Sequence, residues 1–190
     1  MGKFSKISTE AFKEIQFDAG MVLSKFDLEG ATAIADEDIV CTTSGGIQIS
    51  LTPSYTDYGE DIDNVPTNMM ELKEIESWEA KMSFTCLSTS LKAIKIAIGA
   101  ADIADNKVTP RAELKTSDFA DIYWVGDMKD GGWACCRLLN ALGTGGFSLQ
   151  TTKKGKGQIS VELTGHVSIN AQDVVPMEFY ITKGTASTGE

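Results

Sequence analysis

The sequence predicts a mainly β fold with one helix, and three observations lead to that prediction. Apolar and polar residues alternate without a break from Gln158 to Ile169, which is typical of a long strand with one buried and one solvated face. Shorter segments repeat the alternation at 47–52, 78–86 and 147–150. Apolar residues recur at convincing helical spacing only at about 88–101. The polar faces of the strands carry mostly hydroxyl and amide groups.

The first half of the chain is predicted to hold few elements. It begins with an arm at 1–14 and a strand-like stretch at 15–26, and the next long strand is expected at 47–58. An irregular acidic loop is expected at 57–77, because turn-forming residues and Pro66 disfavour regular pairing there.

The C-terminal half of the chain is predicted to begin with a strand at 78–87, followed by the helix. Ser88 is the expected N-cap of this helix, and its expected apolar face consists of Leu91, Ile94 and Ile98. Strands are then expected at 122–125, 133–139, 147–152, 158–169 and 174–181. The third and fourth of these form a hairpin around a lysine-rich turn.

Length and charge set the domain count and the class of partner. The 190 residues fit one domain at 1–183, followed by a disordered tail at 184–190. The net charge is −10, and eight acids against one lysine give residues 57–79 a charge of −7. We do not expect so acidic a chain to bind nucleic acid by neutralising phosphates. We expect its acidic loop to contact the basic turn of another copy, through Asp57, Glu60, Asp61, Asp63, Glu71, Glu74, Lys153, Lys154 and Lys156.

Reactive side chains are few, and each has a structural alternative. His166 is either a base or ligand or, as we favour, a surface residue. Residues 57–64 have oxygens for Ca²⁺ but lack EF-hand spacing, which favours a solvated loop. The glycines at 143–146 precede a strand, which favours a bend over a phosphate cradle. The turn that contains Lys153, Lys154 and Lys156 either contacts phosphate or keeps the hairpin soluble. All four cysteines are expected to be reduced. We expect no catalytic residue, no metal and no cofactor.

Four segments carry a resemblance to a known family. Residues 59–85, 107–111, 121–127 and 140–181, in this order and spacing, resemble the major tail protein, or tail tube protein, of long-tailed bacteriophages and related prophages of Gram-positive bacteria. The resemblance covers nearly the whole chain. It implies a β-sandwich or partly closed barrel of two packed antiparallel sheets with one flanking α-helix, whose sheets join between subunits into a tube.

The same resemblance implies a structural virion protein rather than an enzyme. Subunits assemble in the host cytoplasm into hexameric rings, which stack into the tail tube through which genomic DNA leaves the capsid. The implied partners are other copies of the chain and tail proteins such as the tape measure, terminator and distal tail proteins. DNA passes without specific binding, and no membrane is involved.

The strand faces and the resemblance together predict which residues line the channel. Pairing strands edge to edge around a ring removes exposed edges, and hydroxyl faces limit friction because lysine and arginine contacts add affinity for phosphate. Lys81 is an exception that Glu79 or Glu162 can offset. The predicted channel residues are Gln48, Ser50, Thr52, Ser83, Thr85, Ser148, Gln150, Ser160, Glu162, Thr164, His166 and Ser168.

Two other functions remain open. The tube of a phage-derived bacteriocin or contractile injection device has the same expected fold, and a neighbouring sheath gene or an image of the particle separates it from a phage tail. A carbohydrate-binding or adhesive β-sandwich needs a concave aromatic platform. Trp78, however, falls on an apolar strand face, and Trp124 and Trp133 flank a turn.

Overall fold

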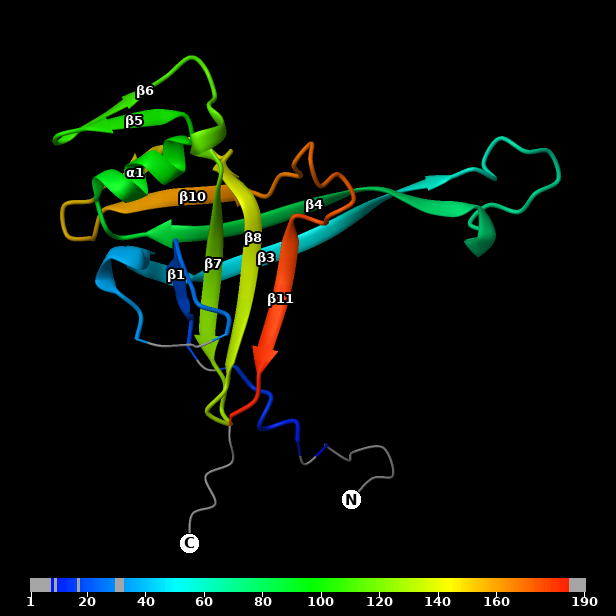
Figure 1. The fold of residues 1–190 in the computed structure, drawn as a ribbon, viewed down its shortest axis with the longest axis horizontal. Coiled ribbons are helices and arrows are strands. Elements are labelled where there is room, and N and C mark those ends of the chain that lie inside the picture. Colours follow the sequence, from blue (N-terminus) through cyan, green and yellow to red (C-terminus); the bar gives the residue numbers. More distant parts are fainter. Residues whose placement is uncertain (1–7, 9, 17, 30–32, 185–190) are drawn as a thin grey trace, which may run out of the picture.

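The computed structural model describes residues 8, 10–16, 18–29 and 33–184, and these are mainly β (Figure 1). The strands are β1 (Met21–Leu23), β2 (Ile39–Cys41), β3 (Thr43–Asp57), β4 (Lys73–Cys86), β5 (Ala101–Ala104), β6 (Lys107–Pro110), β7 (Ala120–Asp127), β8 (Trp133–Gly143), β9 (Ser148–Gln150), β10 (Gln158–Thr164) and β11 (Met177–Thr182). The helices are α1 (Leu91–Ile98) and the short 3₁₀ helices η1 (Asp36–Asp38), η2 (Met70–Leu72) and η3 (Thr116–Asp118).

Nine of the strands form one large antiparallel sheet. Its order is β2-β1-β7-β8-β10-β4-β3, with β11 paired to β8 and β9 paired to β10, and β5 and β6 form a separate two-stranded sheet. Strands β8 and β10 pair only where Gly143 and Leu142 face Leu163 and Thr164. The sheet therefore divides into two halves, which we call the polar-faced half (β9, β10, β4, β3) and the second half (β2, β1, β7, β8, β11).

Both halves contribute to one apolar core, as a sandwich-like fold requires. Met82 and Leu163 from the polar-faced half and Leu138 from the second half are fully buried in the same cluster, together with Ala93 of α1. Burial alternates along β4 and β10 as the sequence predicts, because only one side of each strand faces the core. The mainly β, sandwich-like prediction with one α-helix is confirmed for the described residues. The large sheet is not closed into a barrel.

Helix α1 is shorter than predicted and begins at a different cap. Its N-cap is Ser90, whose Oγ accepts a hydrogen bond from the Ala93 backbone N–H at 3.1 Å. The predicted cap Ser88 is wrong, because its hydroxyl accepts instead from the Thr42 N–H at 3.1 Å. The most buried helix residues are Ala93 and Ala97 rather than the predicted leucine and isoleucines, so α1 lies close to the sheet.

Gly143 explains how α1 can lie so close. A Cβ at this position would lie 2.1 Å from the Ile96 carbonyl oxygen and 3.1 Å from the Ala97 carbonyl oxygen. Only glycine therefore lets the last turn of α1 rest on the end of β8. In the glycine-rich stretch at 143–146, Gly143 serves helix packing, whereas Gly145 lies against Glu162 and Gly146 has a φ of 72°.

The last predicted channel strand ends earlier than expected. Strand β10 stops at Thr164, after which the Gly165 N–H donates to the Ala80 carbonyl at 2.9 Å and the His166 N–H donates to the Leu139 carbonyl at 3.1 Å. The chain thus crosses from β4 to β8 at Gly165, and the alternation beyond it no longer reports burial. Ile169, predicted to lie on the dry face, is 83% exposed.

Strands β3 and β4 form a hairpin that is longer than predicted. Their pairing continues to Asp57 opposite Lys73, so regular pairing replaces the C-terminal part of the loop predicted at 57–77. In Figure 1 the end of this hairpin projects far from the rest of the molecule. We call residues 55–75 the acidic arm.

The cysteines differ from the expectation of four reduced thiols. Cys41 at the end of β2 and Cys86 at the end of β4 form a disulfide in the structure, so the expectation is wrong for this pair. The two residues are 45 positions apart in the sequence, and the β3–β4 ladder brings them together, because Thr43, two residues after Cys41, is paired with Cys86. Cys135 and Cys136 are free and buried.

We expect Cys135 and Cys136 to resist alkylation in the native protein. Burial raises the pKa of each thiol from 9.0 to about 12, so the reactive thiolate is scarce at pH 8. Since the fold retains these protons longer than the unfolded chain, their contribution to stability falls as pH rises from about 9 towards 12. Mass spectrometry after iodoacetamide treatment should show no adducts in native protein, two in urea, and four in urea with reductant. Rapid labelling of native protein would contradict this account.

Two terminal predictions fall largely outside the described residues. Most of the arm predicted at 1–14 and all of the tail at 184–190 except Gly184 lie there. No helix in the described part of the chain is long and apolar enough to cross a membrane.

Candidate assembly surface

The polar-faced half presents one continuous polar surface. Side chains of alternate residues share a face, and the strand register places polar residues of neighbouring strands side by side. The rows across the sheet are Ser148, Ser160 and Thr85; Glu162, Ser83 and Gln48; Thr164, Lys81 and Ser50; and Glu79 with Thr52. Gln150 lies on the same face, opposite Gln158.

The structure therefore brings together every predicted channel residue except His166 and Ser168. These two follow the end of β10, where the alternation has already failed. The His166 ring packs edge-on against Phe119, with centroids 5.2 Å apart, and its Nδ1 lies 3.2 Å from the Asn140 carbonyl oxygen. Ser168 forms an isolated bridge with Ala171.

The charge on this face is nearly balanced. The Lys81 ammonium lies 2.6 Å from a Glu79 carboxylate oxygen and 3.9 Å from a Glu162 carboxylate oxygen. The hydrogen bond to Glu79 raises the pKa of Lys81. The expectation that acids offset this lysine is confirmed, and the face carries no unpaired cation among the residues named above.

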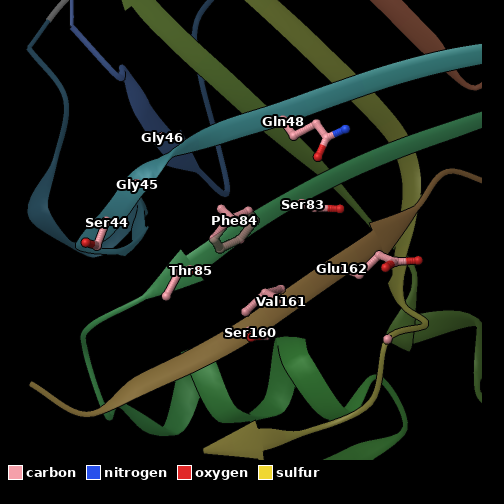
Figure 2. A pocket seen from close by; sticks show the side chains of 11 residues that line it. Ser44, Gly45, Gly46, Gln48, Ser83, Phe84, Thr85, Ser160, Val161 and Glu162 are labelled. Carbon is pink, nitrogen blue, oxygen red and sulfur yellow. The ribbon is translucent and has the colours of Figure 1, made fainter. Parts of the chain in front are cut away.

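A shallow, open hollow of about 390 Å³ lies on this face (Figure 2). Gln48 on β3, Ser83 on β4 and Glu162 on β10 line it, and the figure shows their side chains side by side. Gly45 and Gly46, with φ of 80° and 85°, form its rim, and no atom lies within 4 Å of a Cβ built on either. The hollow offers hydroxyl, amide and carboxylate groups and no nucleophile paired with a base.

The outermost strands of the polar-faced half, β3 and β9, each have one partner strand among the described residues, while the C-terminal end of β10 also pairs with β8. In the described part of the chain, β3 pairs only with β4, and β9 pairs only with β10. Leu149 of β9 lies opposite the buried Ile159, on the face away from the polar surface, yet it is 42% exposed. Unpaired edges with exposed apolar side chains are templates for pairing with another chain.

The acidic arm is organised by Asp57. One carboxylate oxygen accepts from the Gly59 N–H at 2.9 Å and the other accepts from the Asn68 N–H at 2.8 Å. These bonds, with that to Asn68 the stronger cause, lower the pKa of Asp57. Both oxygens are thus used to close the loop. No group of three side chains able to hold a metal occurs within the described residues.

The remaining charged residues predicted for contacts between subunits are exposed. They are Glu60, Asp61, Asp63, Glu71 and Glu74 on the acidic arm and Lys153, Lys154 and Lys156 in the turn between β9 and β10. The arm also exposes Met70 at 82%, together with Tyr58 and Ile62. Sequence reasoning missed these apolar residues, although the run Asn68-Met69-Met70 within an acidic segment is a visible signal.

The arm and the start of β10 lie at opposite ends of the longest axis of the molecule (Figure 1). The lysine turn directly precedes β10. Opposite charges therefore occupy opposite ends of one subunit, an arrangement that favours contacts between identical copies stacked head to tail.

No family model matches the chain, and the comparison with curated proteins finds no significant match.

Proposed function

We propose that the chain is a structural, self-assembling protein: the tail tube subunit of a long-tailed phage, which forms hexameric rings that stack around a channel for genomic DNA. One observation carries the proposal. Ten polar side chains, singled out from alternation and the family resemblance, share one face of a four-stranded half-sheet whose outermost strands, β3 and β9, each lack a second partner among the described residues.

Ring closure follows from those edges. Pairing β3 of one copy with β9 of the next removes both edges and continues the polar face from copy to copy. Six copies then contribute about 24 strands, and a spacing of about 4.8 Å gives a barrel with a backbone diameter of about 40 Å. Such a barrel is wide enough for a nucleic acid duplex.

The chemistry of the face suits passage rather than binding. Each cation that contacts a phosphate adds affinity and salt dependence. On this face the Lys81 ammonium is held by Glu79 at 2.6 Å. DNA therefore meets hydroxyl and amide groups and passes without specific contacts. In this proposal the protein belongs to the virion tail, and its other partners are the tape measure, terminator and distal tail proteins.

Negative-stain electron microscopy of the purified chain, concentrated stepwise, tests the proposal. We expect rings and then tubes above a threshold concentration, with a stain-filled central channel. Particles that stay monomeric at every concentration would contradict it. An image of the particle in the producing bacterium separates a phage tail from a contractile device.

We expect the lysine turn to strengthen assembly at low salt. Replacing Lys153, Lys154 and Lys156 with glutamate should raise the threshold concentration in low salt, because each exposed ion pair contributes about 0–1 kcal/mol and the pairs repeat around the ring. The difference should disappear near 1 M salt, where the Debye length is about 3 Å. Light scattering across a salt series measures the threshold concentration of the variant and of the parent.

The matched control for this prediction changes Lys25, Lys129 and Lys183 to glutamate, which alters the net charge equally. The threshold concentration for assembly of this control should differ much less from that of the parent. If the two triple variants assemble alike at low salt, the turn has no role in stacking.

A further inference from the structure

A groove beside helix α1 has no role in the proposed channel. It has a volume of about 310 Å³ and lies between α1, β5, η3 and the ends of β7 and β8. Ile96, Ile103, Ile122 and Leu163 give it an apolar lining, and the last two reach into the buried core. This volume is about ten times the ~30 Å³ that one water molecule occupies in the liquid, so the groove has room for a large apolar side chain.

The wall of the groove carries positive charge. Lys92 and Lys95 of α1 line it. The Lys92 ammonium donates to the Glu37 carbonyl at 2.7 Å and to the Ser24 hydroxyl at 2.9 Å, which fixes its position at the wall, and the nearby Asp38 and Glu37 carboxylates offset part of its charge. Asp118 also lines the groove, but its carboxylate is paired with Arg111. The groove therefore fits an apolar group that is flanked by acids.

The acidic arm carries such a group. Met70 is among the most exposed large apolar side chains of the described residues, and Glu71 follows it directly in η2. Methionine adapts its shape to apolar sites because its side chain is unbranched and flexible. The arm and α1 lie at opposite ends of the longest axis (Figure 1), so one molecule cannot satisfy its own groove.

We infer that the groove receives the arm of a second copy of this chain, with Met70 inserted among Ile96, Ile103 and Ile122 and Glu71 beside Lys95. This inference rests on the proposed function, because it names the contact that joins successive rings. A contact between two different surfaces of identical subunits gives an open polymer when the rotation between copies does not close a ring, as growth of a tube requires. The lysine turn attracts the arm over distance, and the groove holds it.

Disulfide trapping in assembled tubes tests the contact. The double variant Met70→Cys with Ser117→Cys places one thiol on the arm and one on the groove wall. We expect oxidation to give a ladder of covalent multimers on a non-reducing gel, while each single variant gives at most dimers. The comparison variant Met70→Cys with Thr152→Cys places the second thiol on the lysine turn, and it should give little ladder.

A second measurement tests the same contact if the cysteine variants do not assemble. Met70→Glu should raise the threshold concentration of the parent chain about 10- to 100-fold, because it removes the burial of one methionine per contact. Met70→Leu should stay near the parent. The residue is exposed, so the melting temperature of the unassembled subunit should not change.

The outcomes separate this inference from the proposed function. Tubes that crosslink through Thr152 but not Ser117, or Met70→Glu tubes with an unchanged threshold, overturn the groove contact and leave the proposed function intact. A parent chain that forms no polymer overturns both.

Discussion

Replacing Leu149 with lysine should raise the threshold concentration for assembly at least tenfold while leaving the subunit folded. Leu149 lies on the unpaired β9 edge and is 42% exposed. In the proposed ring it becomes covered by β3 of the next copy. A lysine there loses roughly 1 kcal/mol of apolar burial and places a charge against an apolar neighbour, and about 1.4 kcal/mol corresponds to a factor of ten.

Light scattering gives the threshold for this variant, and circular dichroism checks its fold. Ile169→Lys is the control, because Ile169 is 83% exposed and lies outside both edges. We expect this control to assemble like the parent. Equal thresholds for Leu149→Lys and the parent would show that β9 does not take part in ring closure.

Gly143→Ala should destabilise the subunit by about 1–3 kcal/mol, the usual cost of inserting an atom into a packed interior. The added Cβ would lie 2.1 Å from the Ile96 carbonyl oxygen, which belongs to the helix backbone and cannot rotate away. Helix α1 must shift, and its contacts through Ala97 loosen.

Urea unfolding followed by circular dichroism measures this loss. Gly157→Ala is the matched control, since its Cβ would meet its nearest neighbour, the Leu149 side chain, at 3.7 Å, an ordinary contact. The control should unfold at or slightly above the parent midpoint. A Gly143→Ala midpoint equal to that of the control would contradict the close packing of α1.

The sequence could predict those elements whose two faces meet different surroundings. Residues 80–86 alternate in burial because one side of β4 faces the core and the other faces solvent. The start of β4, from Lys73 to Ser77, gives no such signal, since both of its faces are exposed on the arm. Regular pairing there depends on β3, a partner outside the local pattern.

The same reasoning explains the errors at the candidate surface. The polar face could be predicted because alternation reports which side chains point together. His166 and Ser168 could not, because the chain leaves β4 for β8 at Gly165, and only tertiary contact sets that crossing. Ser88 and Ser90 are equally suitable caps by type, and the use of Ser88 by the distant Thr42 decides between them.

The central claim is that the polar-faced half lines the channel of a homopolymer. A cryo-electron microscopy reconstruction of tubes assembled from the purified chain tests it most directly. The account predicts sixfold rings in which β3 of one copy pairs with β9 of the next, and in which Gln48, Ser83 and Glu162 point into the channel. A tube whose channel is lined by the second half of the sheet, with these three side chains on its outer surface, would contradict the account.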